Sequence, residues 1–134
     1  MPRQRSVILR AVGALGLVAV LVASVYALIG NPLDPFDNRS FSPAGWASAD
    51  PDARARMSRD LVNHYLAPGT TEQQVVALLG KPGTIVNADG RNHVYGVRAY
   101  VYPIGSLSSE MDDTFVYVHL DGNDRVLQAE IDGY

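Results

Sequence analysis

An uncharged apolar run near the N-terminus is the feature that most constrains this chain. Residues 11–29 of the 134 are rich in Val, Leu and Ala and include no charged side chain. At a rise of about 1.5 Å per residue, a helix of this length nearly spans the roughly 30 Å hydrocarbon core of a bilayer. A charge placed mid-membrane would be costly, so its absence matters. The sequence therefore predicts a transmembrane signal-anchor helix over residues 11–29.

The charges on either side of this run predict its orientation. Arginines stand at positions 3, 5 and 10 before the run, and Asp34 and Asp37 follow it. Basic residues that flank a membrane helix are retained in the cytoplasm. We therefore expect residues 1–10 to form a cytoplasmic tail. The chain would be a single-pass protein of a bacterial inner membrane, with its C-terminal domain periplasmic or extracellular.

A cleaved signal peptide is the alternative interpretation of the same residues. Val25, Tyr26 and Ala27 resemble a cleavage site, with small residues at alternate positions. However, the apolar run continues through Leu28 and Ile29, and it is longer than the usual signal-peptide region of about 7–15 residues. The uncleaved anchor is therefore favoured. Both interpretations export the domain, and cleavage would release it as a secreted or periplasmic inhibitor or ligand-binding domain.

Cysteine content and charge exclude several classes of function. The chain has no cysteine, which excludes disulfides, thiolate metal sites, a cysteine nucleophile and a lipidated N-terminal cysteine. After residue 29 there are eight Lys and Arg against fourteen Asp and Glu. Such an acidic domain is poorly suited to nucleic acid, because that binding needs cations to neutralise phosphates. The sequence therefore predicts no nucleic-acid partner.

Residues 30–49 are predicted to be a linker. They contain three prolines among Asn, Ser, Gly and Asp, a composition typical of connecting segments. Three aromatic residues, Phe36, Phe41 and Trp46, interrupt this composition. Large apolar side chains are unfavourable in water, so we expect them to pack partly onto the domain that follows.

Two helices are predicted after the linker. Asp50 followed by Pro51 is a strong start signal, because Asp caps the free N–H groups and Pro fits the first helical turn. Apolar residues then recur every fourth position and define one helix face. They are Ala53, Met57, Leu61 and Tyr65.

The second helix has a start, an apolar face and an end that agree with one another. Thr71 and Gln74 have the spacing of a capping box, which satisfies two free N–H groups. Gly80 suits the closing position of a helix, and a following proline prevents its continuation. The apolar face consists of Val75, Leu78 and Leu79.

The remainder is predicted to form strands over residues 84–86, 93–102, 114–120 and 125–132, with a break at residues 102–105 and a hairpin turn at 121–124. Alternation in the third strand separates Val116, Val118 and Leu120 from Phe115, Tyr117 and His119. In the last strand Leu127, Ala129 and Ile131 are expected to face one way. Residues 50–134 are therefore predicted to be an α+β domain, with two helices packed on a three- to four-stranded antiparallel sheet.

Several motifs in this domain resemble the SmpA/OmlA (BamE-like) domain family. The matching positions are Met57, Asp60, Leu61, Leu66, Gly69, Thr70, Thr71, Val75, Leu78, Leu79, Gly80, Lys81 and Pro82, together with the hairpin over residues 118–126. The resemblance implies two helices on a three-stranded antiparallel sheet, and a module that binds other proteins. Family members are held in the membrane by a lipidated cysteine; here the predicted anchor at residues 11–29 takes that place. Gly69, Thr71, Val75, Leu78, Leu79, Gly80 and Pro82 are expected to have structural roles.

No pattern in the sequence predicts catalysis, a metal or a cofactor. The three histidines lie on separate predicted elements, and no two have the spacing of metal ligands. No nucleophile-elbow motif or phosphate-binding glycine loop occurs. We therefore predict a protein that is not an enzyme and that binds another envelope protein. A hydrolase that uses one of the histidines is the least favoured hypothesis.

Aromatic residues of the predicted sheet are the candidate docking surface. Tyrosine is common at interfaces because its ring is apolar and its hydroxyl polar. The candidates are Tyr95, Tyr100, Phe115 and Tyr117. An uncovered sheet edge that accepts an added strand is a second route to binding.

Overall fold

Capping residues set the ends of the two longer helices. The computed structural model describes residues 33–88, 94–106 and 113–133. At the start of α3 (Pro51–His64), the backbone N–H of Ala53 donates to the Asp50 carboxylate at 2.8 Å. The capping box is present at the start of α4 (Glu72–Leu79). Gly80 ends α4 with a φ of 78°, a value that glycine adopts readily because it has no Cβ. These predicted start and end signals are confirmed.

A third helix lies inside the predicted linker. The Ser42 hydroxyl accepts from the N–H of Gly45 at 3.0 Å and caps α2 (Pro43–Ser48). Trp46 on this helix is only 1% exposed, and its indole N–H donates to the backbone oxygen of Leu79 at 3.2 Å. Phe41 is also buried. The expected packing of Phe41 and Trp46 is confirmed, and the packed part of the chain begins before residue 50.

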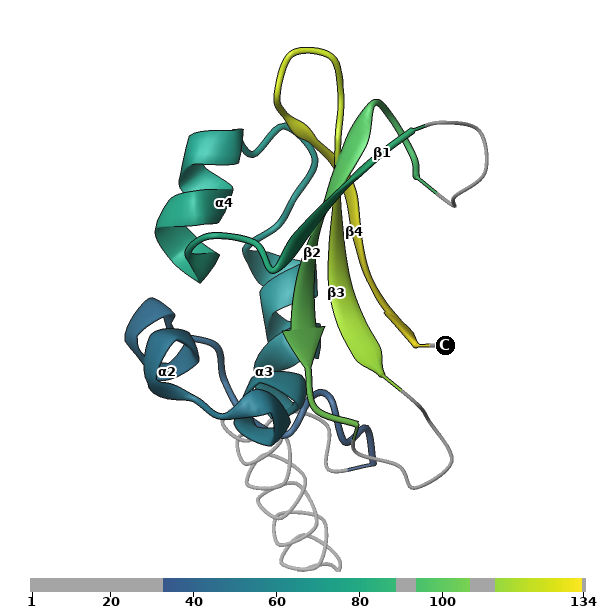
Figure 1. Ribbon diagram of the computed structural model, residues 1–134. Coiled ribbons are helices and arrows are strands. Elements are labelled where there is room, and N and C mark those ends of the chain that lie inside the picture. Colours follow the sequence, from purple (N-terminus) through teal and green to yellow (C-terminus); the bar gives the residue numbers. More distant parts are fainter. Residues whose placement is uncertain (1–32, 89–93, 107–112, 134) are drawn as a thin grey trace, which may run out of the picture.

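Four antiparallel strands form one sheet in sequence order, β1-β2-β3-β4. They are β1 (Thr84–Asn87), β2 (Arg98–Ile104), β3 (Thr114–Leu120) and β4 (Val126–Gly133). Figure 1 shows the helices on one side of this sheet. The prediction of an α+β domain with helices packed on an antiparallel sheet is confirmed.

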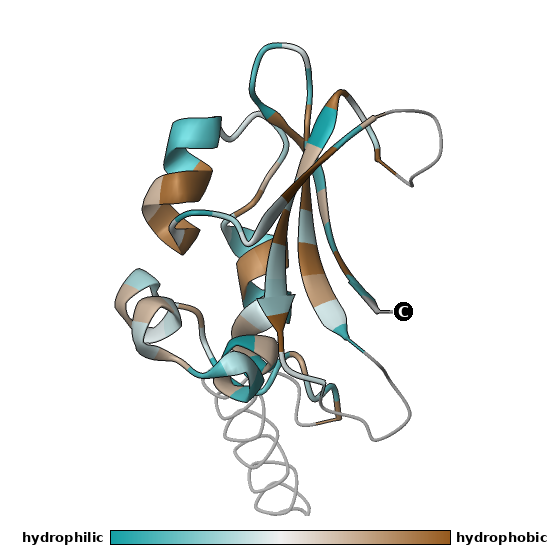
Figure 2. Ribbon diagram, viewed as in Figure 1, coloured by the Kyte–Doolittle hydropathy of each residue, from teal (hydrophilic) through white to brown (hydrophobic). Residues whose placement is uncertain are grey.

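The core lies between the helices and the sheet face that carries the even-numbered residues of β2 and β3. Register pairs Tyr100 with Val118 and Tyr102 with Val116, so these side chains share that face. Figure 2 shows apolar bands on α3, α4 and the strands. The buried apolar residues of the core are Phe41, Trp46, Ala55, Met57, Leu61, Leu66, Val75, Leu79, Tyr100, Tyr102, Ile104, Val116, Val118, Leu120 and Val126.

The buried face of α3 differs from the predicted stripe. Met57 and Leu61 are buried as expected, but Tyr65 is 40% exposed at the end of the helix. Ala55 and Ser58 are fully buried instead. The Ser58 hydroxyl donates to the backbone oxygen of Arg54 at 2.8 Å, so its burial leaves no unmet polar group. A pattern of large apolar residues does not reveal the small ones that allow close packing.

Two strands also depart from their predicted patterns. β2 begins at Arg98 and continues through Pro103, where a break was predicted. β1 pairs with β2 only as far as Val101, so the missing N–H of Pro103 removes no bond to β1. In β4 a register shift opposite His119 and Leu120 leaves Leu127 as an extra residue. Leu127 is therefore 43% exposed and does not share the core face of Ala129 and Ile131.

In the part of the chain that the structure describes, no helix has the length and apolar character needed to cross a bilayer. The predicted anchor at residues 11–29 lies outside these residues.

Gly105 allows the end of β2 to touch the first turn of α3. Its N–H donates to the backbone oxygen of Pro51 at 2.7 Å. A Cβ at this position would lie 2.7 Å from the Cα of Asp52, closer than real side chains approach. A side chain here would therefore push α3 away from the sheet.

We predict that Gly105→Ala lowers the free energy of unfolding by about 1–3 kcal/mol, because overpacking forces the backbone apart. The measurement is urea unfolding of the full chain in detergent, followed by Trp46 fluorescence. Gly122→Ala is the matched control, since a Cβ there meets no atom within 4 Å. Equal stability of the two variants would contradict the prediction.

The buried Tyr102 should make the free energy of unfolding fall at alkaline pH. Its hydroxyl donates to the backbone oxygen of Gly80 at 3.0 Å. Burial raises the pKa of Tyr102, with smaller contributions from Tyr100 and Glu72. The stabilisation is complete below the unfolded pKa of about 10, and it is lost as pH rises towards the folded pKa.

We predict that the free energy of unfolding falls above about pH 10 and that the fall is shallower in Tyr102→Phe. At neutral pH this variant should be less stable by about 1 kcal/mol, because it lacks one hydrogen bond. The check is urea unfolding across the alkaline range. Identical slopes in parent and variant would show that Tyr102 does not carry the effect.

Candidate functional site

A row of aromatic rings lies on the sheet face turned away from the helices. Phe115, Tyr117 and His119 alternate along β3, so they project to the same side. The ring centroids of Phe115 and Tyr117 are 6.2 Å apart at 71°, and those of Tyr117 and His119 are 6.0 Å apart and nearly parallel. Tyr95, which precedes β2, places its ring edge-on to His119 at 5.0 Å. We call Tyr95, Phe115, Tyr117 and His119 the aromatic row.

His119 holds the row in place through both of its ring nitrogens. The backbone N–H of Tyr95 donates to Nδ1 at 3.1 Å. An amide can only donate, so Nδ1 is an acceptor and the proton resides on Nε2. Nε2 then donates to the Glu130 carboxylate at 2.8 Å. The His119 side chain is fully buried, so its role here is to position neighbours and not to contact a substrate.

The four candidate docking residues do not all share one surface. Tyr95, Phe115 and Tyr117 come together in the aromatic row, where Tyr95 is 51% exposed and the other two are half-buried. Tyr100 lies on the opposite face, is 5% exposed, and packs under the helices. Strand alternation explains this, since Tyr100 pairs with Val118 and not with Tyr117.

Carboxylates border the aromatic row on β4. Register places Asp132 opposite Phe115 and Glu130 opposite Tyr117. Gln128 donates to the second oxygen of Glu130 at 3.1 Å. The sequence did not single out Glu130, because its neighbours depend on the register between two strands. The combination of rings and carboxylates suits a partner that presents apolar and basic side chains together.

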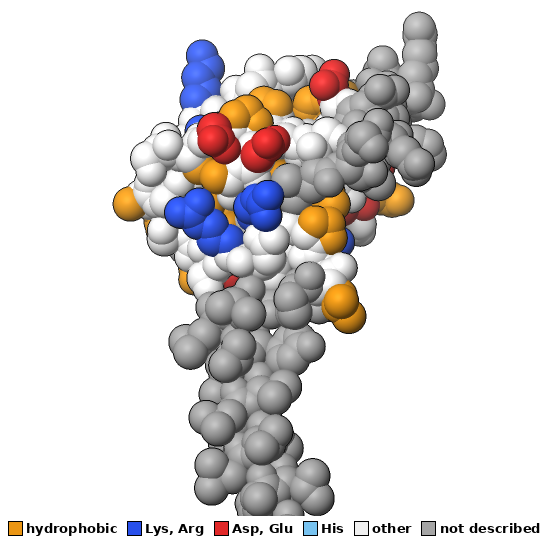
Figure 3. Space-filling view, turned by 90° about the horizontal axis from the view of Figure 1, so that it is seen from below, with side chains coloured by type: hydrophobic (Ala, Val, Ile, Leu, Met, Phe, Trp, Pro, Cys, Tyr) orange, Lys and Arg blue, Asp and Glu red, His pale blue; other side chains and the backbone are white. Residues whose placement is uncertain are grey.

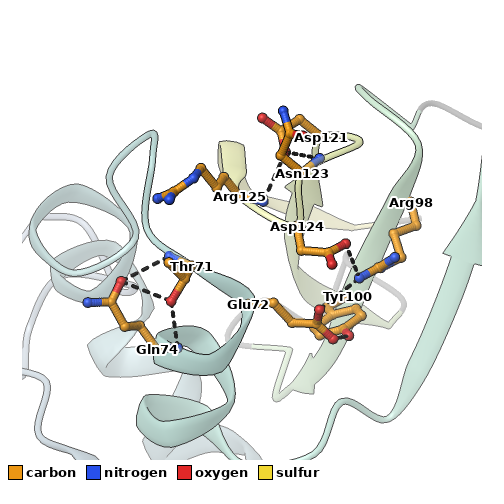
Figure 4. A network of polar contacts seen from close by, with 9 residues as sticks. All are labelled: Thr71, Glu72, Gln74, Arg98, Tyr100, Asp121, Asn123, Asp124 and Arg125. Atoms are coloured by element: carbon orange, nitrogen blue, oxygen red, sulfur yellow. Dashed lines mark hydrogen bonds and ion pairs between the residues drawn. The ribbon is translucent and has the colours of Figure 1, made fainter.

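A second polar cluster joins α4 to the turn between β3 and β4 (Figure 4). Arg98 donates to Glu72 at 2.8 Å and to Asp124 at 2.7 Å, and the Tyr100 hydroxyl donates to Glu72. Burial lowers the pKa of Arg98, but the carboxylates of Asp124 and Glu72 outweigh it and the net pKa is raised. Arg98 therefore stays charged and holds the first turn of α4 against the sheet, which is a structural role.

Several residues on which the predicted SmpA/OmlA resemblance rests make structural contacts in the loop before α4 and along α4. Gly69 donates its N–H to the backbone oxygen of Val126, and Val126 donates to that of Thr70, both at 2.8 Å. These bonds attach the loop between α3 and α4 to the start of β4. Thr71, Val75, Leu78, Leu79, Gly80 and Pro82 cap, pack or end α4, or follow it directly.

A shallow groove of about 320 Å³ lies between the end of α3 and α4. Its lining is Tyr65, Thr70, Gln74, Ala77 and Leu78, without a charged side chain. The groove therefore offers apolar and neutral polar contacts.

Among the described residues, no group of three or more acidic or histidine side chains could hold a metal ion.

No family model matches this chain, and neither a curated protein nor a solved structure matches it. The resemblance to the SmpA/OmlA family stays a prediction that rests on the motif residues and on the order of helices and strands.

We predict that His119→Phe lowers the free energy of unfolding by about 1–2 kcal/mol, because it leaves the Tyr95 N–H without its acceptor. Glu130→Gln is the control, since its amide oxygen still accepts from Nε2; its effect should stay within about 0.5 kcal/mol. Urea unfolding measures both. If His119→Phe were as stable as the parent, the positioning role of His119 would be wrong.

Proposed function

We propose that this chain is a membrane-anchored protein whose domain lies outside the cytoplasm and binds another protein of the cell envelope. The aromatic row is the proposed binding surface, and residues 11–29 are the proposed anchor. The single observation that carries the proposal is the alignment of these rings on the sheet face turned away from α2, α3 and α4, beside the carboxylates of β4. A role in assembly or maintenance of the envelope follows from the resemblance to the SmpA/OmlA family.

The organisation of the aromatic row favours binding. Both ring nitrogens of His119 are hydrogen-bonded, so its position and that of the neighbouring rings is set before a partner arrives. A surface that is already ordered loses less entropy on association. Large aromatic side chains also contribute most of the binding energy at typical interfaces.

Exposed apolar side chains extend the surface beyond the rings. Next to Tyr95 of the row, which is 51% exposed, Val97 and Leu127 are 47% and 43% exposed. They lie close together, because Val97 donates its N–H to the oxygen of Leu120 and the Leu127 side chain approaches Gly96. Exposed apolar groups that cluster in this way are typical of interaction sites.

Charge defines the chemistry of the proposed partner. Glu130 and Asp132 border the rings, and the chain after residue 29 is acidic as a whole. A partner with basic residues around an apolar centre would be attracted to this surface, and added salt would weaken the attraction.

A ligand-binding or inhibitory domain that is released by signal cleavage is the second candidate. The observation that favours it is the groove between α3 and α4, whose volume of about 320 Å³ falls at the lower end of the range for small-molecule sites. Determination of the mature N-terminus separates the two. An intact start supports the anchor, and a start at Leu28 supports release.

We predict that Tyr117→Lys abolishes recovery of the partner. The substitution removes a ring and places a cation against the basic surface of the proposed partner. The experiment is a pull-down from membranes in mild detergent, using a C-terminal tag and mass spectrometry. Val76→Lys is the matched control, as Val76 is an exposed apolar residue on α4. Thermal unfolding confirms that both variants fold.

Two results would contradict the proposal. Normal recovery of the partner by folded Tyr117→Lys would exclude the aromatic row as the binding surface. Failure of the parent protein to recover any envelope protein would remove the proposed function itself. Recovery of barrel-assembly subunits would extend the SmpA/OmlA resemblance from fold to function.

A further inference from the structure

The segment that follows the predicted anchor is held by hydrogen bonds from Asp34 onwards. One carboxylate oxygen of Asp34 accepts from the N–H of Phe36 at 2.9 Å, and the other pairs with Arg59 on α3 at 3.1 Å. The backbone oxygen of Asp34 accepts from the N–H of Asp37 at 3.0 Å. Asp34 therefore forms a turn and attaches it to α3.

Backbone bonds then continue this attachment along α3. The N–H of Arg59 donates to the oxygen of Phe36 at 2.9 Å. The N–H groups of Asn38 and Arg39 both donate to the oxygen of Arg56, at 3.2 and 3.1 Å. The chain from Asp34 to the core is thus docked on α3 and is not a free tether.

Burial of Phe41 completes the attachment. Its N–H donates to the Asp60 carboxylate at 2.7 Å. Its ring is buried between Trp46 and Tyr65, with centroid distances of 6.1 and 4.8 Å. Detaching this segment would therefore expose a core aromatic residue.

Few residues separate this docked segment from the proposed anchor. The apolar run ends at residue 29, and docking begins at Asp34. Extended chain covers at most about 3.6 Å per residue, so the two points lie within roughly 18 Å of each other. The headgroup layer on one side of a bilayer is about 5–8 Å thick. The face of the domain that carries residues 33–39 must then lie at or close to the lipid headgroups.

The chemistry of this face suits a lipid surface. Leu33 is 87% exposed. Arg39 and Arg56 are also exposed, and they lie in two segments that dock together, since the N–H of Arg39 donates to the backbone oxygen of Arg56. Figure 3, seen from below, shows basic side chains gathered on this end with acidic ones next to them. Residues 33–66 have four basic and five acidic residues, whereas residues 67–134 have four and nine. Residues 33–66 therefore carry a net charge of −1 and residues 67–134 a net charge of −5.

We propose that this face, made of Leu33, residues 34–39 and the exposed side of α3, binds the bilayer surface directly. Leu33 enters the interface between headgroups and acyl chains, and Arg39 and Arg56 contact lipid phosphates. The proposal rests on the proposed anchor. Binding in this way would hold the domain in one orientation. The turn between β3 and β4 lies at the end of the domain away from α2 (Figure 1), so on this proposal it points away from the membrane.

The absence of cysteine allows a direct test with single-cysteine variants of the full chain. Leu33→Cys, Ser40→Cys and Asn123→Cys each carry a nitroxide in vesicles of phosphatidylcholine and phosphatidylglycerol that include a nickel-chelating lipid. Electron spin relaxation should be strongly enhanced at positions 33 and 40 and unchanged at 123. No enhancement at position 40, or equal enhancement at 40 and 123, would overturn the proposed orientation.

An insertion between the proposed anchor and the domain distinguishes binding to the lipid surface from simple tethering. A flexible Gly/Ser segment of about twelve residues after Gly30 adds roughly 20 Å of reach. If the face binds lipid, the label at Ser40 keeps its enhancement in this variant. Reversal of both arginines, Arg39→Glu with Arg56→Glu, should then lower the ratio of bound to free domain at least about fivefold in these anionic vesicles. Loss of enhancement on insertion alone would overturn the proposal.

The anchor is tested separately by flotation of the same vesicles at alkaline pH. A chain that floats but shows no enhancement at Ser40 is anchored without binding the surface, which would contradict only this inference. A chain that does not float would contradict the proposed anchor.

Discussion

The burial of one face of β3 in the core is the constraint on which the rest of the structure depends. Val116, Val118 and Leu120 are fully buried on the helix side of this strand. Because side chains alternate along a strand, Phe115, Tyr117 and His119 must then project from the other face. A one-residue slip would exchange the two sets and bury the aromatic rings under the helices. The position of the proposed binding surface is therefore a direct consequence of core packing.

The same core also fixes the N-terminal part of the domain. Phe41 and Trp46 belong to the cluster that includes Met57 and Tyr102. Segment 34–41 is attached to α3, and α3 packs on β2 and β4. The proposed membrane-binding face and the aromatic row are thus connected through one continuous core.

Local signals in the sequence predicted the helix ends well. The features that they did not predict depend on contacts between segments that are distant in the sequence. Asp50, Thr71 and Gly80 act within their own helix, so neighbouring residues suffice to predict them. Leu127 was placed on the core face because the register shift in β4 depends on how β3 pairs with it. Likewise, prolines suggested a linker where Ser42 and Pro43 begin a helix.

The candidate site also combines features that the local sequence predicts with features that depend on distant contacts. The alternation of Phe115, Tyr117 and His119 is visible in the sequence, and the structure confirms that they share a face. Tyr100 was grouped with them by residue type alone, although its parity in β2 places it in the core. Glu130 and the N–H of Tyr95 become partners of His119 only after three separate segments meet. Residue type and strand parity thus identified the rings, but the contacts that hold them required the fold.

The proposed attachment near a membrane would restrict which partners the aromatic row could reach. A domain on a long flexible linker samples many heights above the bilayer, whereas a segment docked from Asp34 onwards allows little variation. On the proposed topology, the row is held within one domain diameter of the lipid surface. Confinement at that height raises the effective concentration of the row for a partner that is also bound to the membrane. It gives no such advantage for a soluble partner. The docked segment therefore favours an envelope protein that itself resides at the same membrane.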